Sequence, residues 1–218
     1  MPNDSPIHRV SPSNGPGSPE VTGIYDEDTG SIQYIAACPQ TKKAALIDVV
    51  LDFDPESART RTDTAEFVLK LAQDAGYEIE WVLDTHPHAD HVMASSFLKV
   101  ETGAPNAIGE KVQEIADLWR GFYHMPGAFK PEADFDRLFA EGDTFRIGNM
   151  DVRVMLSPGH TLGSITYVVG TDAAFVHDTF MQPDAGTSRA DFPGGTASDL
   201  YDSLMAILEL PDETRLFV

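Results

Sequence analysis

The feature that most constrains this chain is a six-residue run, His86-Pro87-His88-Ala89-Asp90-His91. It follows residues 78–84, a segment that is expected to form a buried strand. Pro87 disfavours helix at the preceding residue, so the start of the run is expected to be extended, with His86 and His88 facing the same way. Asp90 and His91 are expected to begin a helix and to approach from another side. Imidazoles beside a carboxylate suit zinc or ferrous iron, so the run predicts a metal site.

Two later elements offer further ligands. The segment Ser157-Pro158-Gly159-His160-Thr161 follows a predicted strand over residues 152–156, and its Pro-Gly turn is expected to aim His160 off the edge of a sheet. Asp178 stands at the end of another predicted strand, residues 173–177. An Asp in that position is usually only a turn residue, so each signal is weak by itself. Together with the first run they indicate one shared metal site.

The remaining chain reads as two β-rich halves that each carry helices, which favours two sheets packed face to face with helices outside. Strands are expected over residues 31–37, 44–50, 78–84, 104–108, 144–147, 152–156, 165–169 and 173–177. Helices are expected over residues 62–76, 91–100, 111–119 and 198–210. Residues 120–140 mix aromatic residues with Pro and Gly, and we expect them to form a long ordered loop over a site.

Two boundaries follow from local composition. Residues 1–20 contain five prolines and four serines, which is typical of a flexible arm. Residues 21–218 are expected to form a single domain. Because the chain stops within a predicted strand that starts at Leu216, this domain is expected to lack its C-terminal end.

Charge and cysteine content narrow the class of partner. With 35 acidic and 15 basic residues the net charge is −20, which disfavours nucleic acid and anionic membranes as partners. No apolar run is long enough to span a bilayer. Cys38 is the only cysteine, so a disulfide framework within the chain is excluded, and a buried, inert thiol is expected. The N-terminal sequence lacks the pattern of a signal peptide, so a cytoplasmic location is expected. The sequence leaves the number of subunits open, and a homodimer is one of the possibilities.

The His-x-His-x-Asp-His run, the Pro-Gly-His-Thr element and the later Asp178 together resemble the metallo-β-lactamase superfamily. The resemblance covers residues 21–218 and implies an α/β protein with an αβ/βα four-layer sandwich. Within the superfamily, the block Asp184-Ala185-Gly186-Thr187-Ser188-Arg189-Ala190-Asp191-Phe192-Pro193-Gly194-Gly195 is similar to an element of the persulfide dioxygenases, and especially of the bacterial β-lactamase-hydrolase-like proteins.

The resemblance implies an enzyme with one Fe(II) per chain, held by His86, His160 and Asp178, which would also be the catalytic centre. This arrangement of two histidines and one carboxylate leaves positions open for substrate and dioxygen. His88, Asp90 and His91 would then orient the ligands or water. The implied reaction is the oxidation of a small persulfide, such as glutathione persulfide, to sulfite, and Arg189, Asp191 and Tyr123 are candidates for binding that substrate.

Two other functions stay open. A thioester hydrolase similar to glyoxalase II would hold two Zn(II) per chain, with His88, Asp90 and His91 as ligands of the second metal. An inactive metal-binding or sensing module would keep the fold without the activity. The sequence also departs from the family at His177, where glycine is common, and we expect the His177 side chain to point away from Asp178, as neighbours in a strand do.

Overall fold

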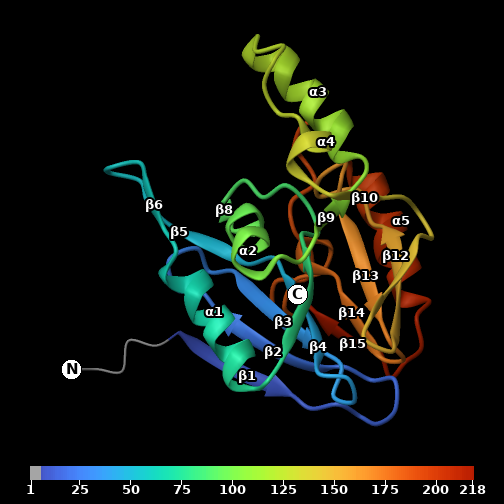
Figure 1. Ribbon diagram of the computed structural model, residues 1–218. Helices are drawn as coiled ribbons and strands as arrows, with labels where there is room; N and C mark the ends of the chain where they lie inside the picture. Colours follow the sequence, from blue (N-terminus) through green and yellow to red (C-terminus); the bar gives the residue numbers. More distant parts are fainter. Residues whose placement is uncertain (1–5) are drawn as a thin grey trace. The chain divides into compact units, whose positions relative to one another are not determined.

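The computed structural model describes residues 6–218 and forms two compact units, each built from strands and helices (Figure 1). The first unit comprises the residues up to 84 together with residues 88–106 and 146–150, and the second comprises residues 85–87, 107–145 and 151–218. The chain therefore passes between the units several times. One of these passages falls inside the His86–His91 run, so the ligand-type residues of that run are shared between the two units.

Five strands of the first unit pair in the order β1-β2-β3-β4-β7, and three more strands pair in the order β6-β5-β8. Neighbours in both sets are antiparallel except β4 and β7, which are parallel. The strands are β1 (Ile7–Ser11), β2 (Glu20–Tyr25), β3 (Ile32–Ala37), β4 (Lys43–Ile47), β5 (Val50–Asp54), β6 (Arg59–Arg61), β7 (Glu78–Leu83) and β8 (Val92–Met93).

The helices of this unit are α1 (Asp63–Asp74) and α2 (Ser95–Thr102). Apolar residues of α1 recur at helical spacing and are buried, which brings one face of the helix onto the sheet. The core between them joins side chains of β2, β3, β4 and β7 to α1 and α2. Its buried members include Ile24, Ile35, Leu46, Val68 and Leu98.

In the second unit, β12, β13 and β14 pair antiparallel and β15 pairs parallel with β14, while β9 pairs parallel with β10. Its elements are α3 (Val112–Tyr123), α4 (Pro131–Asp134), β10 (Arg137–Phe139), β13 (Ile165–Val169), β14 (Ala173–Phe175), the 3-10 turn η1 (His177–Thr179), α5 (Ala197–Leu208) and β15 (Arg215–Phe217). Three strands contain residues of both units, namely β9 (Asn106–Gly109), β11 (Thr144–Ile147) and β12 (Met150–Leu156).

Helix α5 packs on the sheet of the second unit next to η1. Ile207 of α5 is buried with Ala174 of β14 and with Val176, which directly follows that strand. The helix starts at a capped residue, because the Thr196 side chain accepts a hydrogen bond of 3.0 Å from the backbone N–H of Asp199. This packing fixes the end of β14, and Asp178 follows that strand end by three residues.

The expectation of an irregular arm over residues 1–20 is wrong for Ile7–Ser11. These residues form β1, which pairs along its whole length with β2. Backbone pairing with a neighbouring strand does not depend on apolar side chains, so a segment rich in Pro and Ser still joins the sheet between its prolines. Residues 1–5 of the predicted arm lie outside the described residues.

Four other expected elements differ in the structure. The predicted loop over residues 120–140 instead contains the end of α3, then α4 and β10. The strand expected over residues 44–50 is two strands, because Asp48 adopts a φ of 52° between β4 and β5. The helix expected from His91 begins only at Ser95, and the strand expected to reach His177 ends at Phe175. In each case a local backbone turn, invisible to hydrophobic periodicity, decides the boundary.

Cys38 is buried, as expected, and its Sγ lies 2.8 Å from Oδ1 of Asn149. Over residues 6–218, no helix combines the length and the apolar character needed to cross a membrane.

Candidate metal centre

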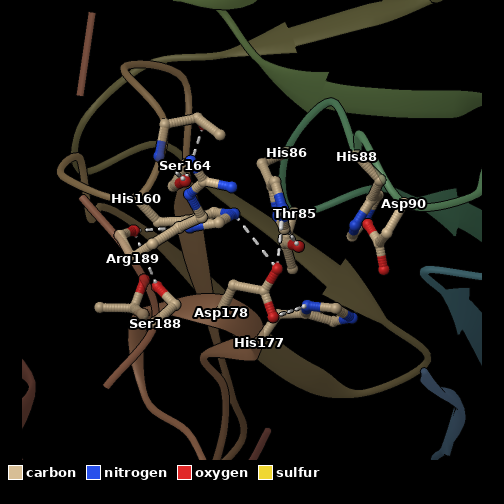
Figure 2. A network of polar contacts seen from close by, with 12 residues as sticks. Thr85, His86, His88, Asp90, His160, Ser164, His177, Asp178, Ser188 and Arg189 are labelled. Carbon is tan, nitrogen blue, oxygen red and sulfur yellow. Dashed lines mark hydrogen bonds and ion pairs between the residues drawn. The ribbon is translucent and has the colours of Figure 1, made fainter. Parts of the chain in front are cut away.

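The second unit brings together the three side chains that the sequence singled out as metal ligands. His86 comes from the short segment after β7, His160 from the turn after β12, and Asp178 from η1. Nε2 of His86 lies 3.4 Å from Oδ2 of Asp178, and Nε2 of His160 lies 3.2 Å from the same oxygen. The two imidazole rings are almost perpendicular, with centroids 5.1 Å apart. Figure 2 shows both rings directed at the Asp178 carboxylate.

The burial of these three side chains makes the group suitable for binding a metal ion and distinguishes it from a surface ion pair. The His86 side chain is 2 % exposed and that of His160 is 9 % exposed, whereas that of Asp178 is 25 % exposed. The imidazoles are thus held inside the protein while the carboxylate keeps a path to solvent.

The hydrogen bonding of His160 indicates which kind of ion the group can bind. Its Nδ1 lies 2.9 Å from the backbone carbonyl of Arg189, which only accepts, so Nδ1 carries the proton and donates. In the neutral ring Nε2 then presents a lone pair to the carboxylate oxygen of Asp178. Two lone pairs face each other stably only when a cation lies between them, either a proton or a metal ion. The donor set therefore fits a metal.

The pKa shifts agree with this interpretation. Burial alone would lower the pKa of His160, but the Asp178 carboxylate and the Arg189 carbonyl raise it above its usual value. Burial alone would raise the pKa of Asp178, but contacts with His160, His177 and His86 hold it well below its usual range. The ionised carboxylate beside protonated imidazole is the arrangement in which protons take the place of a metal cation.

The turn that carries His160 is tightly packed. Gly159 adopts a φ of 136° and lies against the backbone of Leu200 in α5, so that no side chain fits there. Ser203, one turn further along α5, donates a hydrogen bond of 2.7 Å from Oγ to the carbonyl of Pro158. The sequence indicated a sharp Pro-Gly turn, and the structure adds that α5 holds it in place.

The block that resembles the persulfide dioxygenases supports His160 from its other side. The Arg189 carbonyl orients the ring through Nδ1, and the Phe192 ring packs edge-on against it with centroids 5.1 Å apart. The Arg189 side chain forms a bidentate ion pair with Asp191 at 2.6 and 2.9 Å and lies over the Phe192 ring. Tyr123, the third candidate for substrate binding, lies in a different element, since it belongs to α3 and stacks on Trp119. Substrate binding by these three residues stays a prediction.

The expectation for His177 is wrong. Its Nδ1 lies 3.2 Å from Oδ1 of Asp178, and its ring lies edge-on to that of His86, so it points toward the group and not away from it. The alternation of a strand does not apply, because His177 lies in η1 and adopts a φ of 37°. Ligand atoms of His86, His177 and Asp178 lie within 4.8 Å of one another.

A second group of ligand-type residues lies in the first unit. Ligand atoms of His88, Asp90 and His91 lie within 4.8 Å of one another, and the rings of His88 and His91 have centroids 4.1 Å apart. Nε2 of His88 lies 3.2 Å from Oδ1 of Asp48. The hydrogen bond with His91 lowers the pKa of Asp90 to about 2, against the effect of burial. Whether this group binds a second metal or orients other residues stays open.

Two acidic residues of this region escaped the sequence analysis. Asp48 and Asp84 are both about 1 % exposed and lie at the ends of β4 and β7. Burial, together with the nearby Asp48 carboxylate, raises the pKa of Asp84 to about 8, and the Ser95 hydroxyl donates to it. The available signal was an Asp directly after each apolar strand, in Ala44-Ala45-Leu46-Ile47-Asp48 and in Trp81-Val82-Leu83-Asp84.

Comparison with known proteins agrees with this geometry. A family model for the metallo-β-lactamase superfamily matches residues 30–217. The chain belongs to this superfamily. Its fold is accordingly the mixed α/β metallo-β-lactamase fold, in a superfamily composed mostly of metal-dependent enzymes.

Within the superfamily, the chain is 54% identical over 200 residues to a beta-lactamase hydrolase-like protein of Xylella fastidiosa, which covers 92% of this chain and 46% of that protein. The chain thus spans about half the length of such curated relatives. It is also similar to the crystal structure of ETHE1 from Myxococcus xanthus, with 30% identity, a TM-score of 0.69, and coverage of 89% and 72% of the two chains. A hydroxyacylglutathione hydrolase of Rhodospirillum rubrum is 31% identical over 84% of this chain and 59% of its own length.

Proposed function

We propose that the chain is a mononuclear iron dioxygenase that oxidises a small persulfide, with glutathione persulfide as the expected substrate. The observation that carries the proposal is the convergence of Nε2 of His86 and Nε2 of His160 on one carboxylate oxygen of Asp178. Two imidazoles and one carboxylate that leave open positions are the donor set of non-haem ferrous oxygenases.

The similarity to ETHE1, a persulfide dioxygenase, and to the beta-lactamase hydrolase-like proteins supports this branch. The hydroxyacylglutathione hydrolase is less similar to this chain than the beta-lactamase hydrolase-like protein of Xylella fastidiosa, at 31% against 54% identity. The expected reaction converts a persulfide, dioxygen and water into a thiol and sulfite, so the outer sulfur is oxidised and the S–S bond is broken. Bound iron supplies the electron chemistry that activates dioxygen, which no side chain supplies.

The residues of the chain hold and shield the reacting groups. The Arg189 carbonyl keeps the proton of His160 on Nδ1 and its lone pair on Nε2, and burial of both histidines keeps water off their metal-facing sides. Because the Asp178 side chain is 25 % exposed, we expect substrate to approach from its side. Arg189 is a candidate for contact with a substrate carboxylate, and its pairing with Asp191 must loosen for that contact.

Metal content with oxygen uptake tests the proposal directly. The purified chain, reconstituted anaerobically with Fe(II), is expected to hold about one iron per chain and to consume oxygen when glutathione persulfide is added. Sulfite should form in step with oxygen consumption. A chain that holds iron but shows neither oxygen uptake nor sulfite formation would refute the persulfide reaction, and a chain that binds no metal would favour the inactive module.

The principal alternative is a thioester hydrolase with two zinc ions. It is favoured by one observation, the grouping of His88, Asp90 and His91 within 4.8 Å, which offers ligands for another metal. Under this alternative the chain would hold about two zinc ions and hydrolyse a glutathione thioester without oxygen.

The variant His91→Ala separates the two functions. If the iron is held by His86, His160 and Asp178, the variant should retain most of its iron and a measurable rate of oxygen uptake. If two zinc ions are bound, the variant should lose about one metal per chain, because an imidazole ligand is removed outright. Metal analysis of the variant and the unmodified chain, loaded in parallel with each metal, distinguishes the outcomes.

A further inference from the structure

His177 occupies a backbone conformation that suits glycine better than histidine. Its φ is 37°, a positive value at which the Cβ of an ordinary residue crowds its own backbone. The residue is nevertheless a histidine, and its side chain is 8 % exposed. A strained residue with a buried imidazole ring is retained only when the surrounding structure holds it, and such residues cluster at functional sites.

The contacts of the Asp178 carboxylate show what His177 does there. The two oxygens have separate surroundings, since Oδ2 faces Nε2 of both His86 and His160, whereas Oδ1 lies 3.2 Å from Nδ1 of His177. Figure 2 shows the His177 ring on the side of the carboxylate opposite to His160. The His177 imidazole therefore lies against the carboxylate oxygen that does not face the other two histidines.

The turn itself does not depend on the His177 side chain. The N–H of Thr179 donates to the carbonyl of Val176 at 3.0 Å, and the N–H of Phe180 donates to the carbonyl of His177 at 3.2 Å. These are backbone hydrogen bonds that any residue at position 177 can keep. Replacing the side chain should therefore remove the contact with Asp178 without dissolving η1.

We propose that His177 is a positioning residue that contacts Oδ1 of Asp178 and thereby keeps Oδ2 directed at Nε2 of His86 and Nε2 of His160. This inference rests on the proposed role of Asp178 as a metal ligand. A polar side chain in contact with a ligating carboxylate restricts its orientation, and loss of such an outer partner typically weakens metal binding. The strain at His177 is then the cost of placing an imidazole where glycine would fit the backbone.

Two variants test the role of the side chain against the strain of the backbone. His177→Gly removes the imidazole and relieves the strain, so the metal-free variant is expected to melt at the same temperature as the unmodified chain or roughly 2–4 °C higher. Its affinity for Co(II), followed by the visible absorption of the bound ion, is expected to fall by about 10–100-fold. A general loss of structure would instead lower the melting temperature together with the affinity.

His177→Asn is the matched control. Asparagine tolerates a positive φ, and its side-chain amide places a donor near the position of the histidine Nδ1. This variant should bind Co(II) within a few-fold of the unmodified chain and retain its absorption spectrum. Unchanged affinity in His177→Gly would overturn the proposal. Loss of Co(II) binding from both variants would also overturn it, because His177 would then be a ligand in its own right.

These outcomes are independent of the persulfide reaction. Co(II) affinity and the melting temperature of the metal-free chain report on Asp178 whether or not the iron-loaded chain oxidises persulfide. If oxygen uptake is absent but the two variants differ in affinity as described, the proposed activity fails while the role of His177 stands.

Discussion

Replacing His160 with alanine is expected to abolish both iron binding and persulfide-dependent oxygen uptake. The variant removes one of two imidazoles that converge on Oδ2 of Asp178, and it leaves the Arg189 carbonyl without its donor. Loss of a direct ligand should weaken iron binding by more than the roughly 10–100-fold that follows loss of an outer partner. Iron content after desalting and oxygen uptake with glutathione persulfide measure the two effects.

The control for this variant is His8→Ala, the same substitution at an exposed histidine of β1. It should bind one iron and consume oxygen at the unmodified rate. Because His160 is largely buried, circular dichroism of His160→Ala is needed to show that the fold persists. Oxygen uptake that survives in a folded His160→Ala variant would contradict the proposed centre.

Replacing Gly159 with alanine should destabilise the second unit severely. A Cβ at this position would lie against the backbone N and Cα of Leu200 and 2.5 Å from its Cβ, and the φ of 136° disfavours any residue other than glycine. Overpacking and backbone strain together predict a loss of about 4 kcal/mol or more in the free energy of unfolding. Chemical denaturation, with iron content of any folded fraction, measures the loss.

Gly121→Ala provides the matched comparison. Gly121 lies within α3, and a Cβ there meets no heavy atom within 4 Å apart from its chain neighbours and the backbone of its own helix. Alanine should therefore stabilise the helix by roughly 0.5–1 kcal/mol. If Gly159→Ala unfolded at the same denaturant concentration as the unmodified chain, the close packing of the Pro158-Gly159 turn on α5 would be refuted, and with it our account of how His160 is placed.

The order of residues along the chain was enough to predict the chemistry that this site offers and many of the elements around it. The density of ligand-type residues in the His86–His91 run, with His160 and Asp178 each placed after a predicted strand, was sufficient to predict a shared metal site and the superfamily. Hydrophobic periodicity located α1, β12 and β13 because these elements bury one face or both along their length. Local patterns of this kind survive in the sequence because burial acts on each element in turn.

The way in which the ligand-type side chains are held became apparent only from the folded chain. The Arg189 carbonyl that fixes the proton of His160 is a backbone group, so no side-chain pattern announces it. Asp48 became a partner of His88 through a positive φ between two strands, and His177 turned toward Asp178 because β14 ends two residues earlier than periodicity indicates. These contacts join residues distant in sequence or depend on single backbone angles, and their energies arise only when the folded chain places the groups together.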